Sequence, residues 1–210
     1  MVAVVPGFGP FGAFTVNPAE LLVGSLADRG EPDIVTEILP VAKDQVAGRI
    51  TELMRRHRPD LWLGVGLAAG RSALSVEAVA VNLMDWPSEH ADVDGQSVSR
   101  RPVADDGPAA YLTTLPVEKI LSAWRDAGIP GYLSLSAGSY LCNMSFYLAA
   151  RAASELGLAT MVGFVHVPLL PELVDQPERQ PSMARALQAA GLDCVIDAGR
   201  TGTDRAGLYL

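Results

Sequence analysis

Cysteine and histidine are scarce in this sequence, which has only Cys142, Cys194, His57, His90 and His166 in 210 residues. Two cysteines cannot form a disulfide framework, and we expect both to be reduced in a cytosol. The histidines show no spacing, with one another or with a cysteine, that is typical of zinc ligands. A structural metal site is therefore not expected.

Long basic runs and long apolar runs are also missing. The formal net charge is −8, and the 16 Lys and Arg residues form no stripe, so the sequence lacks the surface that neutralises nucleic-acid phosphates. No apolar run approaches the roughly 20 residues that span a bilayer, and the strand-like start Met1–Pro6 carries no basic leader. We predict a cytoplasmic protein that binds neither nucleic acid nor membranes.

What the sequence does have is an ordinary globular composition. Hydrophobic residues make up 49% of the chain and charged residues 19%, which excludes a disordered or collagen-like protein. A chain of 210 residues can bury one sizeable core but is too short for two ordinary domains with a linker. We predict a single domain over residues 1–210.

Short apolar runs alternate along the chain with longer segments of helical period. This alternation predicts an α/β fold, a three-layer sandwich in which helices cover both faces of a central sheet. Strands are predicted at 2–6, 34–40, 60–66, 74–83, 131–136 and 160–167, and helices at 18–29, 42–57, 116–127, 139–156 and 178–190. The segments 85–110 and 168–181 are predicted to be long surface loops, and whether 85–110 closes over a site is left open.

One cysteine stands at the predicted start of a helix. The strand at 131–136 leads into Ser136–Ser139, a turn and capping composition, so that Cys142 falls in or beside the first helical turn. The free N–H groups and the positive dipole end at that position favour a thiolate, the reactive form of cysteine. We predict a reactive thiol, with an inert buried cysteine as the alternative.

The next strand, Thr160–Pro168, carries His166 near its end. The strand before the helix, the helix and this strand would form a βαβ unit. We therefore predict that the two strands are parallel, with their carboxyl ends at one edge of the sheet. Cys142 and His166 would then meet where open α/β sheets bind ligands, and a neutral imidazole there can activate a thiol. A hydrogen-bonded core histidine is the alternative interpretation.

A single carboxylate, Glu77, interrupts the apolar strand Leu74–Asn82. Burying an unpaired carboxylate is costly, so Glu77 needs a partner such as an imidazole N–H or an arginine. If the partner is His166, the carboxylate would fix the tautomer of the imidazole, as the third residue of a catalytic triad does. A structural ion pair with Arg71 is the alternative.

The glycine-rich segment Gly7–Gly12 spells G-x-G-x-x-G after a strand, a pattern that occurs in dinucleotide-binding turns. In such a site a helix begins within the motif, whereas Pro10, the bulky phenylalanines and Asn17-Pro18 delay the helix here to about residue 18. We therefore interpret the segment as a loop that lines the active-site edge.

Four segments together carry a family resemblance: Ser134–Asn143, Gly66–Asn82, Gly163–Pro168, and Gly7–Gly12 with Asn17-Pro18. They resemble the pyroglutamyl peptidase I family of cysteine peptidases, also called pyrrolidone carboxyl peptidases. The run Ser134–Asn143 resembles the family's cysteine signature, and Gly66–Asn82 is similar to its glutamate signature. Gly163–Pro168 resembles its histidine segment, and Gly7–Gly12 with Asn17-Pro18 resembles its N-terminal loop. The order and spacing of these segments agree over nearly the whole chain.

The resemblance implies a mixed, largely parallel sheet and a thiol peptidase that removes N-terminal pyroglutamyl residues from peptides, without metal or cofactor. Cys142 would be the nucleophile, His166 the base and Glu77 the residue that orients the base. Bacterial members are commonly homo-oligomers, so a dimer or tetramer is expected. The expected substrate contacts are Phe8, Phe11, Asn17, Leu67, Tyr140 and Leu141, with the two phenylalanines forming the apolar pocket for the lactam ring.

The sequence also departs from the family pattern. Leu67 stands where many bacterial members have a glutamine that helps to recognise the substrate, Ala78 replaces a usual basic residue, and Asp85–Ser88 lacks the usual arginine. The alternative function is thus an altered or inactive relative that binds or hydrolyses a different cyclic amide or small ligand. Cys194 is predicted to be a surface or interface thiol, and pairing between subunits is left open.

Overall fold

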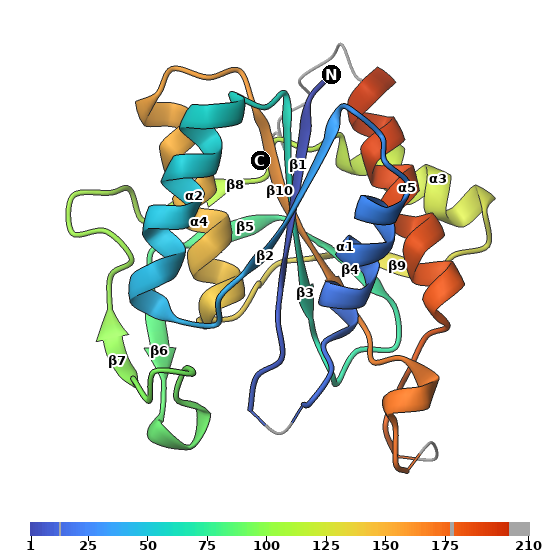
Figure 1. The fold of residues 1–210 in the computed structure, drawn as a ribbon, viewed down its shortest axis with the longest axis horizontal. Helices are drawn as coiled ribbons and strands as arrows, with labels where there is room; N and C mark the ends of the chain where they lie inside the picture. The colour runs from blue at the N-terminus through green and yellow to red at the C-terminus, as the bar shows by residue number, and fades with distance from the viewer. Residues whose placement is uncertain (13, 177–178, 202–210) are drawn as a thin grey trace.

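The computed structural model describes residues 1–12, 14–176 and 179–201 of the chain. Strands and helices alternate along it (Figure 1). The helices are α1 (Pro18–Asp28), α2 (Lys43–His57), α3 (Val117–Asp126), α4 (Leu141–Glu155) and α5 (Arg185–Thr201), with short 3-10 helices η1 (Ser88–His90) and η2 (Pro171–Leu173).

The central sheet has six strands in the order β2-β1-β3-β10-β4-β9. These strands are β1 (Ala3–Phe8), β2 (Ile34–Leu39), β3 (Leu61–Leu67), β4 (Leu74–Glu77), β9 (Gly131–Ser134) and β10 (Met161–Val167). The strands from β2 to β10 run parallel, whereas β4 pairs antiparallel with β10, and β9 pairs parallel with β4. The mixed, largely parallel sheet confirms the predicted fold class.

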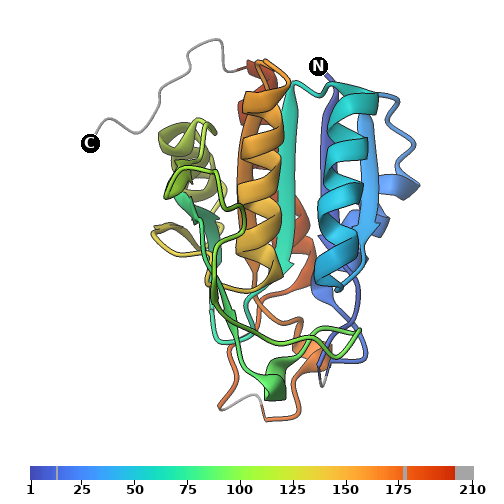
Figure 2. The same cartoon turned by 90° about the vertical axis from the view of Figure 1, so that its left-hand side faces the viewer.

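Helices cover both faces of this sheet. Figure 1 shows α2 and α4 on one side and α1, α3 and α5 on the other, and Figure 2 brings α2 and α4 to the front. Every residue of β1 and β3 is buried, as expected for parallel strands that are covered on both faces. One hydrophobic cluster lies beneath α1, α3 and α5 and a second beneath α2 and α4. Each face of the sheet is therefore packed against its helices by a core of its own.

The predicted parallel relationship between the strands on either side of α4 is wrong. In the sheet, β4 lies between β9 and β10, and it is parallel to β9 but antiparallel to β10. The two flanking strands therefore run in opposite directions. The start of α4 still reaches the carboxyl edge of β10, because residues 135–140 bridge from β9 and α4 then runs back along the sheet (Figure 1).

The predicted strand 74–83 is divided at Ala78, whose N–H donates to the Ser134 carbonyl and whose carbonyl accepts from the Thr113 N–H. The chain leaves the central sheet there, and β5 (Val79–Val81) pairs with β8 (Ala110–Leu112) instead. The prediction of a long loop over 85–110 is also wrong in part, because β6 (Met84–Trp86) pairs with β7 (Val98–Arg101). The strands β6 and β7 and the residues between them, 84–101, are called the arm; it projects near the starts of α2 and α4 (Figure 2).

Two buried side chains hold this arm in place. The Trp86 indole is buried and donates to the Gln96 carbonyl at 3.0 Å. The Asp92 carboxylate is also buried and accepts backbone N–H groups of Gln96 and Asp94 within the arm. It accepts a third N–H from Lys43, the first residue of α2, so the arm is fastened to the body of the protein.

The predicted helix 178–190 has the wrong boundaries, since α5 spans Arg185–Thr201, and residue 178 lies outside the described residues. Gly191 lies inside α5, at a position where a side chain would collide with its neighbours. A Cβ at this position would lie 2.1 Å from Leu74 Cδ1, and the Trp124 indole donates to the Gly191 carbonyl. The close packing accounts for glycine at this position, although glycine is unfavourable inside a helix.

Candidate active site

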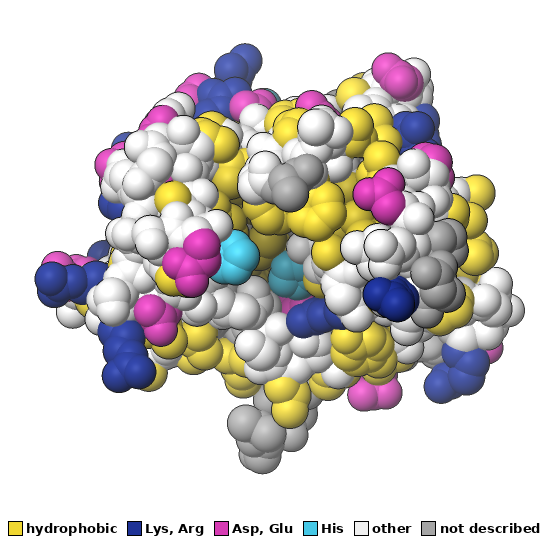
Figure 3. All heavy atoms as spheres, turned by 90° about the horizontal axis from the view of Figure 1, so that it is seen from below, with side chains coloured by type: hydrophobic (Ala, Val, Ile, Leu, Met, Phe, Trp, Pro, Cys, Tyr) yellow, Lys and Arg dark blue, Asp and Glu magenta, His cyan; other side chains and the backbone are white. Residues whose placement is uncertain are grey.

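The carboxyl ends of β3 and β10 and the start of α4 meet at one edge of the sheet (Figure 1). Viewed from that edge, the surface is hollowed near its middle, with histidine, acidic and basic side chains in and around the hollow (Figure 3). Open α/β sheets bind ligands at this edge. The three residues predicted to be catalytic come from elements that converge here.

Cys142 is the second residue of α4, as the sequence predicts for a helix start. Tyr140 is the N-cap residue, with extended backbone, and the turn before it uses Gly138 at φ +79, a conformation that glycine adopts without strain. The next residue, Asn143, is fully buried and exchanges hydrogen bonds with both backbone groups of Val81. Asn143 therefore fixes the first turn of the helix, and with it the position of Cys142.

The thiol of Cys142 lies directly over β3. A Cβ added to Gly66 would lie 2.7 Å from Cys142 Sγ, so only glycine allows the sulfur to come this close. Gly66 is in register with His166 on the neighbouring parallel strand β10. The sulfur and the imidazole are thus placed over adjacent strands at the same level of the sheet.

Glu77 lies at the end of β4, and its side chain is fully buried. Its Oε1 atom lies 2.7 Å from His166 Nδ1, on the adjacent strand. We assign the imidazole the tautomer that carries its proton on Nδ1, since a carboxylate can only accept a hydrogen bond. That assignment leaves Nε2 as the basic nitrogen.

Arg71 is the second partner of Glu77, so the carboxylate has both of the partners that the sequence suggested. Arg71 Nη1 donates to Glu77 Oε1 at 2.5 Å and also to the Ser75 hydroxyl. Its Nη2 donates to the Ser136 carbonyl at 3.0 Å, in the connection that leads to the Cys142 helix. Arg71 thereby links the carboxylate to the segment that positions the cysteine.

The electrostatics of the site follow from burial and from these contacts. Burial lowers the pKa of His166 below its ordinary 6.5, although the hydrogen bond with Glu77 acts in the opposite direction. Burial opposes ionisation of Glu77, but His166 and Arg71 outweigh this effect and hold the pKa of the carboxyl below its usual value. The pair therefore consists of a neutral imidazole and a carboxylate near neutral pH.

The surroundings of Cys142 oppose the thiolate that its position at the helix start led us to expect. Although the residue keeps some accessible surface, protein atoms surround its thiol, and burial followed by the nearby charge of Glu77 raises its pKa to about 12. A neutral thiol beside a neutral imidazole needs general-base activation to become a nucleophile.

Two of the residues predicted to contact substrate line one cavity. Phe11 and Tyr140 belong to a cavity of about 580 Å³ beside the start of α4, and their ring centroids lie 6.2 Å apart. The ring centroids of Phe14 and Phe11 lie 5.7 Å apart, and those of Trp86 and Tyr140, which pack edge to face, lie 5.0 Å apart. Sequence reasoning missed Phe14 and Trp86, because they come from a loop and an arm whose positions depend on long-range contacts.

The other predicted substrate residues are buried. Phe8 and Leu67 end β1 and β3 at this edge with 4% and 8% exposure, and Leu141 begins α4 with 1%. Asn17 is fully buried; its side chain caps α1 by accepting from the Ala19 N–H and donates to the Gly9 carbonyl. It thus shapes the glycine-rich loop, and α1 begins at residue 18, as predicted.

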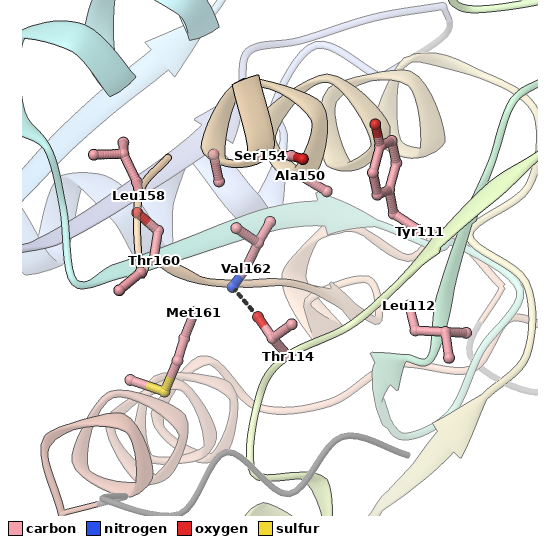
Figure 4. A pocket seen from close by; sticks show the side chains of 11 residues that line it. Tyr111, Leu112, Thr114, Ala150, Ser154, Leu158, Thr160, Met161 and Val162 are labelled. Atoms are coloured by element: carbon pink, nitrogen blue, oxygen red, sulfur yellow. Dashed lines mark hydrogen bonds between the residues drawn. The ribbon is translucent and has the colours of Figure 1, made fainter. Parts of the chain in front are cut away.

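A second cavity of about 270 Å³ lies at the far end of α4 (Figure 4). Thr114 and Val162 are neighbours in its lining, where the Val162 N–H donates to the Thr114 hydroxyl at 2.7 Å. Its lining contains no cysteine, histidine or carboxylate, so it offers no hydrolytic chemistry.

Among the described residues, no three His, Cys, Asp or Glu side chains are grouped to hold a metal ion, and no helix has the length and apolarity needed to cross a membrane.

Comparison with known proteins gives a consistent result. The family model described as pyroglutamyl peptidase matches residues 1–201. Pyrrolidone-carboxylate peptidase of Pyrococcus furiosus is 34% identical over 203 residues, covering 94% of this chain and 97% of the relative. The same-named protein of Vibrio vulnificus is 38% identical over 195 residues, covering 92% and 90%. A crystal structure of a mutant pyrrolidone carboxyl peptidase from P. furiosus matches with a TM-score of 0.90 at 33% identity, covering 97% of this chain and 100% of that one. The chain therefore belongs to the pyroglutamyl peptidase family of cysteine-type hydrolases.

Proposed function

We propose that this protein removes N-terminal pyroglutamyl residues from peptides, with Cys142 as nucleophile, His166 as general base and Glu77 as the residue that orients the base. The observation that carries the proposal is the 2.7 Å contact between His166 Nδ1 and Glu77 Oε1, in a chain whose family match spans residues 1–201. The contact leaves Nε2 available to accept a proton, and Cys142 lies over the strand next to His166.

In the first half of the reaction, His166 Nε2 takes the thiol proton while Cys142 Sγ bonds to the carbonyl carbon of the pyroglutamyl residue. The tetrahedral intermediate then collapses, the C–N amide bond breaks, and the imidazolium gives its proton to the departing amine. The products of this step are the shortened peptide and a thioester on Cys142. Backbone N–H groups of the first turn of α4 are the proposed donors to the oxyanion.

In the second half, His166 accepts a proton from water, and the resulting hydroxide adds to the thioester carbonyl. The C–S bond breaks, the sulfur regains a proton from the imidazolium, and pyroglutamate leaves. Glu77 keeps the imidazole in one tautomer and stabilises the positive charge that forms on it in both halves. Neither half requires a cofactor.

Substrate recognition is part of the same proposal. Phe8 and Phe11 would form the apolar pocket for the lactam ring, with Asn17, Leu67, Tyr140 and Leu141 around it. The proposed binding partner is the peptide substrate. We further propose that the protein is cytoplasmic, that residues 1–210 form a single domain, and that it assembles as a homo-oligomer. Leu67 and the segment 85–88 depart from the family pattern, which favours a change in the residues that contact the substrate. The second candidate is therefore an altered relative that acts on a different cyclic amide.

The test uses matched fluorogenic amides of pyroglutamate, proline and glutamine with the full-length chain. The proposal predicts release of the fluorophore from the pyroglutamyl amide and a rate at least about a hundredfold lower from the other two, because only the lactam combines the flat ring with the ring carbonyl. Equal rates on all three amides, or hydrolysis of none of them, would reject pyroglutamyl specificity and favour the second candidate.

A further inference from the structure

The cavity that contains Phe11 and Tyr140 is larger than a lactam ring requires. Its volume of about 580 Å³ falls within the range of sites that enclose whole small ligands, about 300–1,000 Å³. From the aromatic rings beside α4 it extends to β6 and η1 of the arm, where Asp85 and Glu89 belong to its lining. A substrate group beyond the lactam therefore has room next to these carboxylates.

The nucleophile lies close to the aromatic end of this cavity. Tyr140, in the lining, is the N-cap residue of the helix whose second residue is Cys142, and Cys142 itself lies outside the lining. A lactam that packs against Phe11 would thus have its scissile carbonyl near the start of α4. The residue that follows the scissile bond must then lie near the start of α4. The acidic end of the cavity is within the same enclosure.

The charged side chains in the lining of the cavity are acidic. Asp85 and Glu89 are both exposed, and within the described part of the chain neither carboxylate has an ion-pair partner within 4.0 Å. Their hydrogen bonds come from uncharged donors, the Arg100 backbone N–H to Asp85 and the Ser88 hydroxyl to Glu89. No lysine or arginine belongs to the lining, in which His90 is the remaining side chain able to carry positive charge.

The acidic end is held in a fixed position relative to the nucleophile. The Asp85 N–H donates to the Ser139 carbonyl at 3.2 Å, and the Ser139 hydroxyl donates to the Asp85 carbonyl at 2.6 Å. Ser139 lies three residues before Cys142, so β6 is tied to the connection that leads into α4. A carboxylate in a pre-organised position attracts a cation more effectively than one on a free loop, because less ordering is needed on binding.

These observations combine a negative wall with half-buried aromatic rings, the two features that recognise a cationic side chain. We propose that the cavity receives the second residue of the substrate and selects lysine or arginine there, so that the preferred substrates are pyroglutamyl peptides with a basic second residue. This inference rests on the proposed pyroglutamyl peptidase function. Asp85 and Glu89 are its specificity-determining residues.

The experiment compares three pyroglutamyl dipeptide amides that differ only in the second residue, which is lysine, leucine or glutamate, and measures kcat/KM from the released amino-acid amide. We expect the order lysine, leucine, glutamate, with about a tenfold or larger ratio of lysine to glutamate at low ionic strength. The ratio should shrink in 0.5 M salt, because exposed charges are screened. Equal kcat/KM for the three amides would overturn the inference while leaving the proposed function in place.

Two charge-matched double variants identify the source of the preference. Asp85→Asn with Glu89→Gln should bring the lysine to glutamate ratio to within about twofold of unity. Asp28→Asn with Asp126→Asn removes the same charge from exposed positions on α1 and α3 and should leave the ratio unchanged. A ratio that falls equally in both variants would assign the preference to net charge and reject the cavity. If the wild-type protein hydrolyses none of the three amides, the proposed function fails and this inference falls with it.

Discussion

His166 Nδ1 and Glu77 Oε1 lie 2.7 Å apart on the adjacent antiparallel strands β10 and β4. Both side chains are buried, and strand pairing fixes their backbones, so the imidazole is oriented before any substrate arrives. Arg71 also donates to this oxygen, and the contacts of Glu77, first of all the one with His166, hold the pKa of the carboxyl below its usual value. This arrangement allows the roles of the three groups to be separated by mutation.

Replacing Glu77 by glutamine should lower kcat by about 10³–10⁴-fold with a smaller change in KM, because the imidazole loses its fixed tautomer and the stabilisation of its charged form. The measurement is steady-state hydrolysis of a pyroglutamyl amide. Glu52→Gln is the matched control, since Glu52 pairs with Arg49 on the surface, and it should keep wild-type kcat. A Glu77→Gln enzyme with nearly full kcat would contradict an orienting role for Glu77.

The pH dependence of kcat/KM should report His166. The base must be neutral to act, and burial lowers its pKa below 6.5, so activity should persist at pH 6.5 and fall as the pH decreases through that lower pKa. Glu77 raises the pKa of His166, and the residual activity of Glu77→Gln should therefore lose its acid limb at a still lower pH. An acid limb that lies above pH 6.5, or one that moves upward in this variant, would be inconsistent with the assignment.

Alkylation by iodoacetamide should distinguish a neutral thiol from a resting thiolate. Because the pKa of Cys142 is raised to about 12, its labelling rate in the free enzyme should rise about tenfold per pH unit between pH 7 and 9. The measurement uses a Cys194→Ser background, so that Cys142 is the one cysteine left in the sequence. A rate that is already constant across this range would indicate a thiolate and imidazolium pair in the resting enzyme.

Gly66 should be intolerant of even the smallest side chain. A Cβ there would lie 2.7 Å from Cys142 Sγ and 2.9 Å from ring atoms of Phe164, so Gly66→Ala should cost about 1–3 kcal/mol of unfolding free energy. It should also lower kcat about a hundredfold by displacing the sulfur. Thermal unfolding and the pyroglutamyl amide assay measure the two effects.

Gly48→Ala is the control for Gly66→Ala. Gly48 lies in α2, where an added Cβ would have no atom within 4 Å apart from its chain neighbours and the backbone of its own helix, and alanine favours a helix by about 1 kcal/mol over glycine. The control should therefore raise the melting temperature and leave kcat unchanged. A Gly66→Ala enzyme with wild-type stability and rate would show that the thiol does not depend on this close approach.

Local patterns predicted the order of the helices and of the central-sheet strands, and the helix start at Cys142, because strand, turn and helix signals lie close together in the sequence. The direction of β9 relative to β10 could not be derived in this way. It depends on the insertion of β4 between them, a pairing between residues that are far apart in the chain. Likewise, the place of Gly191 inside α5 reflects its close approach to Leu74, a residue far away in the chain.

The candidate site was predictable to a similar extent. A lone carboxylate in an apolar strand required a buried partner, and Glu77 contacts both His166 and Arg71. The protonation state of Cys142 was not predictable, because it depends on the burial of the thiol and on Glu77, which is 65 positions earlier in the chain. That the trio is catalytic remains a proposal, which needs a chemical test.

The most direct test is to trap the thioester. The protein is mixed with a pyroglutamyl ester substrate, quenched in acid during turnover, and digested for mass spectrometry. The account predicts a pyroglutamyl adduct on the peptide that contains Cys142, and none on the Cys194 peptide or in the Cys142→Ala variant, which should also lose hydrolysis. Turnover by Cys142→Ala at the wild-type rate, or an adduct on another residue, would contradict Cys142 as the nucleophile.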